Sequence, residues 1–299
     1  MAGIAAADRN GIGMQGAAYN AEVAGSAVGY DYDSDGTFYT RADAYDYYVA
    51  HPEIKVINNS WGGARYIDES TWDADPYAEI RPYLDSDTML LAGQQGKLLV
   101  FAAGNGGHPT PELQPLAVTA YPAMRTKLLS VTNLDAYNTR QDGKIAANQA
   151  QSNVMSWFSD LAKYVEDSTL AARGSSIFSA NADYAWTGIL DISMSGTSMA
   201  APYVTGAGAL VQQAFPYMSG KQIGDVLLST ANSNIEYSKG LVMQIQEDRD
   251  AQGQTINRQN IFVMDSSLKS LTQAELLAKC DEYMQGQTSE YLLSVYSDA

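Results

Sequence analysis

Six apolar residues in succession, Leu98 to Ala103 (LLVFAA), stop abruptly at four residues that favour a turn, Gly104 to Gly107 (GNGG). A short apolar run closed by glycine is typical of a strand that is buried on both faces. Such strands belong to parallel sheets that are covered by helices on both sides. The run therefore predicts an α/β domain.

The rest of the chain alternates in the same way. Apolar or β-branched runs predict strands, and longer runs with helical spacing or small residues predict helices, which together indicate a mostly parallel sheet with helices on both faces. In the longest helix, Gly206 and Gly208 would each cost about 1 kcal/mol relative to alanine, so we expect this helix to pack very close to the sheet. The predicted strands are residues 21–30, 54–60, 98–103 and 128–133, and the predicted helices are residues 39–50, 85–96, 197–215 and 219–231.

The start of the longest helix carries the strongest chemical signal, in the octapeptide Ser195 to Pro202 (SGTSMAAP). A serine at a helix start lies among backbone N–H groups that have no acceptor within the helix, at the positive end of the helix dipole. Ser198 is therefore well placed to form an acyl-enzyme, because its own N–H can help to hold the oxyanion. The alternative is an ordinary capped helix packed through Ala and Gly.

The full octapeptide resembles the nucleophile motif of the subtilisin-like serine proteases, the subtilases. The segment Phe101 to Gly107 resembles the strand end whose Asn donates a hydrogen bond to the oxyanion in that family. The resemblance implies that Ser198 is the nucleophile and Asn105 the oxyanion donor. Two further segments, Ala2 to Ala18 and Leu170 to Ser179, are similar to family segments in the same order. The likeness covers about residues 2–231 and implies the three-layer subtilisin-like α/β fold, with a mostly parallel central sheet.

The same resemblance implies a binding site for polypeptide substrates. Residues 57–63 (INNSWGG) are similar to the segment that lines one side of the primary specificity pocket and pairs with the substrate backbone as an added strand. The strand end before Asn105 would form the opposite wall. The implied substrate-binding residues are Ser60, Trp61 and Gly62 on one side and Ala102, Ala103 and Gly104 on the other.

A serine protease also needs a general base and a group that orients it. In the subtilases these are a His and an Asp that precede the serine, and the His lies just before the segment that Ala2 to Ile4 resembles. We therefore expect the catalytic Asp and His to lie outside these 299 residues, in a missing N-terminal portion. The two histidines present are predicted to have other roles, His51 on the surface and His108 at most lining the cleft.

Two functions follow from this expectation. The first is a serine endopeptidase whose catalytic domain is N-terminally truncated, so that this chain alone is inactive or poorly active. The second is a non-catalytic pseudoprotease that keeps the cleft as a peptide-binding or interaction surface. An upstream coding segment with the Asp and His would favour the first.

Metal binding is a lesser expectation, because the chemistry requires no cofactor. Residues 31–36 (DYDSDG) look like the start of a calcium loop, but the twelfth position of an EF-hand would be Ala42 and not Glu, so an acidic turn is expected there. Residues 10–14 resemble the family's calcium loop. Asn10 is therefore the candidate ligand of a structural calcium ion.

Composition limits the partners and the organisation of the chain. A net charge of −16 disfavours binding to nucleic acid, and no apolar run is long enough to span a bilayer. The family implies an extracellular or bacterial cell-surface location, and the acidic, Tyr-rich character resembles the passenger domains of bacterial autotransporters. After residue 231 the amino-acid composition becomes polar. We expect a partial peptidase domain over 1–231 and an appendage or insertion over 232–299, with amphipathic helices at 268–293.

Overall fold

The computed structural model describes most of the chain up to residue 231 and four pieces beyond it. The described residues are 1–26, 40–62, 80, 88–108, 110–135, 154–156, 158–181, 188–189, 191–231, 241–249, 255–263, 275 and 290–295.

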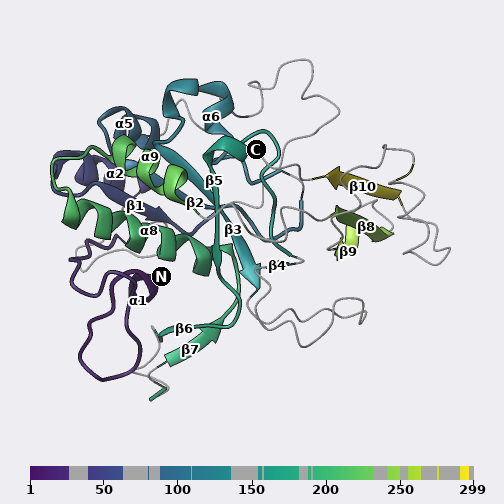
Figure 1. Ribbon diagram of the computed structural model, residues 1–299, viewed down its shortest axis with the longest axis horizontal. Helices are drawn as coiled ribbons and strands as arrows, with labels where there is room; N and C mark the ends of the chain where they lie inside the picture. The colour runs from purple at the N-terminus through teal and green to yellow at the C-terminus, as the bar shows by residue number, and fades with distance from the viewer. Residues whose placement is uncertain are drawn as a thin grey trace.

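Four parallel strands form the centre of the domain, in the order β1-β2-β3-β5 (Figure 1). Leu134 of β3 pairs with both Arg173 of β5 and Met155 of the short antiparallel strand β4, so β4 and β5 lie on opposite edges of β3. The predicted parallel sheet is therefore confirmed. The strands are β1 (Val56–Asn59), β2 (Leu98–Ala102), β3 (Leu128–Asp135), β4 (Val154–Met155) and β5 (Thr169–Arg173).

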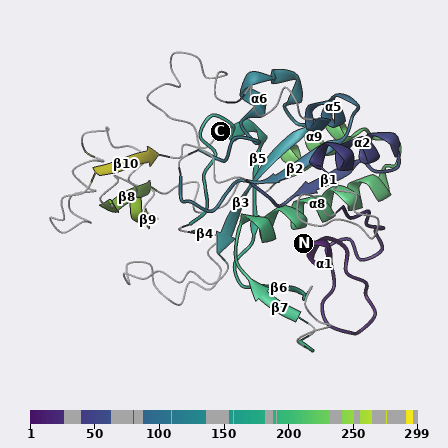
Figure 2. The ribbon, with the colours of Figure 1, turned by 180° about the vertical axis from the view of Figure 1, so that it is seen from behind.

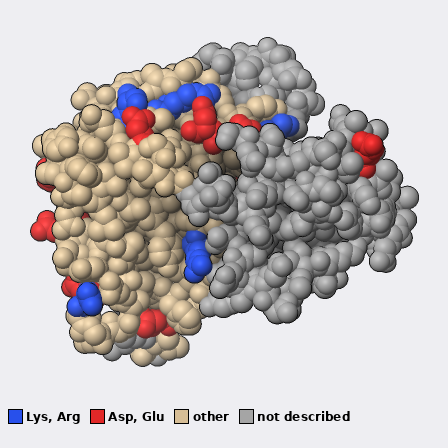
Figure 3. All heavy atoms as spheres, in the orientation of Figure 1, with Lys and Arg blue, Asp and Glu red and all other residues tan. Residues whose placement is uncertain are grey.

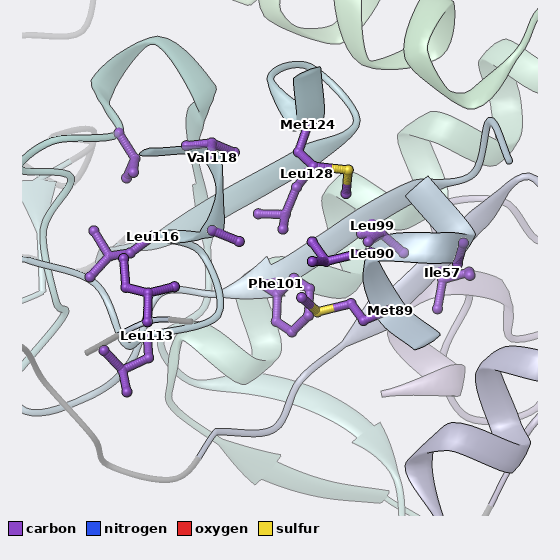
Figure 4. Close-up of a cluster of buried hydrophobic side chains, with 14 of the residues drawn as sticks. Ile57, Met89, Leu90, Leu99, Phe101, Leu113, Leu116, Val118, Met124 and Leu128 are labelled. Atoms are coloured by element: carbon purple, nitrogen blue, oxygen red, sulfur yellow. The ribbon is translucent and has the colours of Figure 1, made fainter. Parts of the chain in front are cut away.

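Strand β2 is buried along its whole length, as its unbroken apolar sequence predicts. Leu99 and Phe101 point into one hydrophobic cluster, which Figure 4 shows around Met89 and Leu90. The alternate residues of β2, with Val100 at their centre, belong to a second cluster. Because side chains alternate along a strand, each face of β2 is covered by a different layer.

Helices supply the two covering layers (Figures 1 and 2). The first cluster takes residues from α2, α5 and α6, and the second takes residues from α8 and α9. Helix α2 begins with a capping box, in which Thr40 and Asp43 bond each other's backbone N–H groups. The helices are α2 (Arg41–Ala50), α5 (Thr88–Gln94), α6 (Ala117–Ala120), α8 (Thr197–Ala214) and α9 (Gly220–Thr230), with 3-10 turns at η1 (Pro122–Met124) and η2 (Glu166–Ser168).

The glycines of α8 permit close packing, but against two different partners. A Cβ built on Gly208 would lie 3.2 Å from a methyl of Val56 in β1, which confirms the predicted approach to the sheet. A Cβ built on Gly206 would instead lie 2.7 Å from Cβ of Ala17 and 3.0 Å from the carbonyl oxygen of Ala5. Gly206 therefore makes room for helix α1 (Ala2–Ala6) and the segment that returns over it.

The predictions fail in two places. Residues 21–26 form no regular element, so the strand predicted at 21–30 is wrong there, and its last four residues lie outside the described residues. Beyond residue 231 the described residues form strands apart from Glu275, which is helical, and residues 290–293 of the predicted amphipathic helices belong to β10. The remaining strands are β6 (Ile177–Ala180) and β7 (Asp191–Met194), which pair with each other, and β8 (Leu241–Arg249), β9 (Thr255–Val263) and β10 (Glu290–Val295), which form an antiparallel sheet.

Candidate active site

Ser198 lies in the first turn of α8, as the octapeptide predicts. Gly196 is the N-cap and has no side chain to cap the helix, so the first N–H groups must find acceptors elsewhere. The N–H of Thr197 finds one outside the helix, and the N–H of Ser198 has no acceptor among the described residues. The Ser198 N–H is therefore available to a negatively charged ligand atom.

The acceptor for Thr197 is the carboxamide of Asn105, at the end of β2. Its Oδ1 accepts hydrogen bonds from the Thr197 N–H at 2.8 Å and from the Thr197 hydroxyl at 3.1 Å. Because both donors bind Oδ1, the Nδ2 group of the same amide faces away from them, and no described residue accepts a hydrogen bond from it. Asn105 is exposed, so this second donor can reach a ligand beside Ser198.

Thr197 joins the helix start to the strand end and is fully buried. Its hydroxyl accepts from the N–H of Gly104 at 3.2 Å and lies at the same distance from the Gly104 carbonyl oxygen. A group bonded to both Gly104 and Asn105 fixes the position of the loop relative to α8. Sequence reasoning missed this role, although Thr197 stands inside the octapeptide.

A second connection runs from β1 to the helix start. The Ser60 hydroxyl donates to the Ser198 carbonyl at 2.9 Å and accepts from the Asn58 amide at 2.9 Å, and Asn58 in turn accepts from Thr205 of α8 at 3.0 Å. The Ser198 hydroxyl lies 3.5 Å from the Ser60 carbonyl oxygen. The side chain of Ser60 thus positions Ser198.

A buried carboxylate holds the loop that carries Asn105. Asp160 is 0% exposed, and its Oδ1 accepts from the N–H of Gly106 at 2.9 Å and from the N–H of His108 at 2.7 Å. Its own N–H donates to the Gly104 carbonyl oxygen at 3.0 Å. No sequence motif marked Asp160, since its partners are distant along the chain.

Nucleophile, amide donor and helix start thus meet at the carboxyl ends of β1 and β2. A profile of the subtilase family matches residues 1–260. The chain belongs to the subtilase family. The family match continues past residue 231, and the domain boundary placed there stays a prediction.

Known subtilases resemble the chain over most of its length. An extracellular serine protease of Serratia marcescens is 31% identical over 77% of this chain, and subtilisin BL of Lederbergia lenta is 28% identical over 81% of it. The chain spans 25% of the Serratia protein and 73% of subtilisin BL. Among solved structures, sphericase is 23% identical and matches with a TM-score of 0.50, covering 79% of this chain and 69% of its own, which supports the three-layer fold.

The two predicted pocket walls of this subtilase differ in their exposure to solvent. Ala102 and Ala103 are buried, while Gly62 is exposed. The indole of Trp61 packs edge-on against Phe101 with ring centroids 5.5 Å apart, and Arg41 lies over it at 4.4 Å. The Trp61 side chain is half-buried and belongs partly to the core.

Neither histidine of the chain touches Ser198. His51 precedes β1, and its carbonyl accepts from the Lys97 ammonium at 2.6 Å, which places it at the amino edge of the sheet, opposite Ser198. Burial lowers the pKa of Lys97 there. His108 is held through its backbone by Asp160 and Leu161. No imidazole is hydrogen-bonded to the Ser198 hydroxyl.

The calcium candidate gains no support from its surroundings. The side-chain oxygen of Asn10 is exposed and accepts a hydrogen bond from the N–H of Ile12 at 2.9 Å. Within the described residues no group of three or more His, Cys, Asp or Glu side chains gathers to hold a metal ion. The acidic turn at 31–36 lies outside the described residues.

Two further observations concern the surface. Charged side chains are scattered over the described part of the face in Figure 3, with no large patch of one sign. In the part of the chain that the structure describes, none of the helices is long and apolar enough to cross a membrane.

Proposed function

We propose that the chain carries the nucleophile and the oxyanion donors of a serine endopeptidase site, in which Ser198 forms the acyl-enzyme. The observation that supports this is the pair of bonds from Thr197 to Asn105 Oδ1, which leaves Asn105 Nδ2 and the Ser198 N–H as donors beside one hydroxyl. Two preorganised donors of this kind stabilise the negative charge that develops on a substrate carbonyl during attack.

The proposed reaction follows from these positions. A polypeptide substrate lies along the backbone of residues 60–62 as an added strand, with the side chain before the scissile bond between that segment and residues 102–104. Ser198 Oγ attacks the carbonyl carbon and loses its proton to a general base. The carbonyl oxygen becomes negative and accepts from Asn105 Nδ2 and the Ser198 N–H. The amine leaves with a proton, and water later releases the acid.

The base in this proposal is an imidazole from outside these 299 residues, because among the described residues the Ser198 hydroxyl bonds only the Ser60 carbonyl and neither His51 nor His108. These residues alone would then have very low activity, since an enzyme whose triad lacks its base keeps a rate enhancement of only about 10³–10⁴ over the reaction in water. The same observation keeps a second function open, a non-catalytic protein that binds peptides in the cleft. The extracellular proteases among the relatives support an extracellular location and polypeptide partners for either function. Our proposal keeps residues 232–299 as an appendage or insertion.

Labelling with a fluorophosphonate tests the proposal. The chain is produced alone and, separately, from its own gene with all the coding sequence around it. We expect a Ser198 adduct in the second preparation and none in the first, and no adduct in a Ser198→Ala control. Absence of label in both preparations would favour the peptide-binding protein, and rapid label in the chain alone would show that a base lies within it.

A further inference from the structure

Asparagine followed by glycine occurs twice in the chain, at Asn10–Gly11 and at Asn105–Gly106. This dipeptide favours deamidation, because glycine has no Cβ to hinder the approach of its backbone nitrogen to the side chain of the preceding asparagine. Both asparagines are exposed. Asn105 is also the proposed oxyanion donor, and its Nδ2 group would be lost in the reaction. The surroundings of the two pairs therefore decide whether the proposed site stays intact.

The reaction needs no reagent other than water. The glycine nitrogen gives up its proton to solvent, and its electron pair forms a bond to Cγ of the asparagine. The bond from Cγ to Nδ2 then breaks, and Nδ2 takes a proton from solvent and leaves as ammonia. Water opens the resulting cyclic imide to aspartate or isoaspartate. A glycine N–H that donates to a strong acceptor is withheld from the first step, because that hydrogen bond must break before the nitrogen can attack.

At Asn105 both reacting groups are held. The N–H of Gly106 donates to Oδ1 of Asp160 at 2.9 Å, and Asp160 is 0% exposed. The same oxygen accepts from the N–H of His108 at 2.7 Å, which fixes the carboxylate against the loop. The side-chain oxygen of Asn105 accepts from Thr197. Because a hydrogen bond to a carboxylate is roughly twice as strong as one between neutral groups, breaking the bond from Gly106 slows the attack considerably.

At Asn10 only the side chain is held. Its Oδ1 accepts from the N–H of Ile12 at 2.9 Å, and none of the described residues accepts a hydrogen bond from the N–H of Gly11. Gly11 has a φ of 79°, and a Cβ built on it would meet nothing within 4 Å. The glycine therefore lies in open space, and no hydrogen bond within the described part of the chain has to break before its nitrogen attacks Asn10.

We infer that Asp160 protects Asn105 from deamidation by holding the N–H of Gly106, and that Asn10 is the site at which the reaction proceeds. One hydrogen bond to a charged group predicts that Asn105 reacts about 10- to 100-fold more slowly in the folded protein than in the unfolded chain. Asn10 should react at nearly the unfolded rate. The benefit to catalysis rests on the proposed function, because a carboxylate in place of the Asn105 amide would repel the oxyanion.

Peptide mapping by mass spectrometry tests the inference. The protein is made from its own gene with Ser198→Ala, so that it cannot cleave itself, and is kept at neutral pH either folded or in urea. Conversion of the peptides that contain Asn10 and Asn105 is followed over time. In urea the two asparagines should react at similar rates, whereas in the folded protein Asn105 should react far more slowly than Asn10. Equal rates in the folded protein would overturn the protection, and an unreactive Asn10 would overturn its assignment as the open site.

Two variants in the same Ser198→Ala protein assign the protection to Asp160. Asp160→Ala removes the acceptor and should bring the rate at Asn105 close to the unfolded rate. Asp160→Asn keeps the size of the side chain but removes its charge, and should give an intermediate rate. The rate at Asn10 should not change in either variant and serves as the internal control. An unchanged rate at Asn105 in a variant that keeps the parent's circular dichroism spectrum would overturn the inference.

Fluorophosphonate labelling separates this inference from the proposed function, since the mass measurement does not depend on catalysis. In the protein with an intact Ser198, Asp160→Ala should lose labelling, relative to its fresh preparation, in step with the conversion of Asn105. Labelling that persists after Asn105 is converted would overturn the proposed role of Asn105 as an oxyanion donor. The protection by Asp160 would still be decided by the deamidation rates.

Discussion

Replacement of Thr197 by valine isolates the hydroxyl that ties α8 to the end of β2. Valine keeps a branched side chain of nearly the same volume in this fully buried position, and only the hydrogen-bonding atom is lost. The Gly104 carbonyl keeps its donor, the N–H of Asp160, and Asn105 Oδ1 keeps the N–H of Thr197. The Gly104 N–H has no other acceptor among the described residues. One buried donor is therefore left unsatisfied.

The size of the effect follows from that single group. A buried donor without a partner costs about 1–3 kcal/mol, so Thr197→Val should lower the free energy of unfolding by that amount. Thr197→Ser is the matched control, because it keeps the hydroxyl and loses one methyl group, at about 1 kcal/mol. We expect the valine variant to be the less stable of the two. Urea unfolding followed by circular dichroism measures both.

The same pair of variants affects the chemistry differently. In Thr197→Val the Asn105 amide keeps only one of its two donors and is oriented less firmly, so the rate of fluorophosphonate labelling of the protein made from its own gene should fall. In Thr197→Ser both donors to Asn105 remain, and the rate should change little. If the valine variant proves as stable as wild type and is labelled as fast, the hydroxyl does not fix the loop, and this account of the oxyanion donors is wrong.

Three further variants test separate parts of the structure. Asn105→Ala should lower turnover by about 10²–10³ in the protein made from its own gene, the effect known for one oxyanion donor in subtilisin, with little change in KM. Gly206→Ala should destabilise the fold by about 1–2 kcal/mol in urea unfolding, because the backbone of α1 blocks the new methyl group. In Gly208→Ala the new methyl meets only side-chain methyls, and the stability should stay within about 0.5 kcal/mol of wild type. The reverse order of stability would contradict the packing. The hydrogen bond from Lys221 lowers the pKa of Asp225. The pair therefore stabilises the fold above pH about 3.8 and loses that contribution as the pH falls through the lowered pKa. Asp225→Asn should lower the free energy of unfolding by no more than about 0.5 kcal/mol at pH 7 and should change nothing at pH 2.

The sequence predicts those parts of the fold whose signal is local. An unbroken apolar run indicated β2, and small residues bounded by Gly196 and Pro216 indicated α8. The meeting of Asn105 with the helix of Ser198 was predictable from two motifs of one family. The strand at residues 21–30 was not a sound prediction, because a short run of Ala and Val carries no information about a partner, and a strand needs one to be stable.

Glu112 and Asp160 show what the sequence cannot reveal. Both contact residues far along the chain. Asp160 accepts hydrogen bonds from the N–H groups of Gly106 and His108, and the Glu112 side chain lies against Gly62. Neither stands in a motif or in a periodic segment, so only the folded arrangement brings them to the strand ends. The side chain of Trp61 is a similar case, because its packing on Phe101 depends on the register between β1 and β2.

The two halves of the proposed chemistry have different structural requirements. The proposed oxyanion donors are two N–H groups held by the buried side chains of Thr197 and Asp160 and by the half-buried Ser60, and these contacts are in place without substrate. A base must instead reach the Ser198 hydroxyl, whose one hydrogen bond among the described residues is the long contact with the Ser60 carbonyl. A weakly bonded hydroxyl can turn toward an incoming imidazole at little cost. We therefore expect the hydroxyl to accept a base with little rearrangement, and the N–H donors to stabilise the transition state rather than to position the serine.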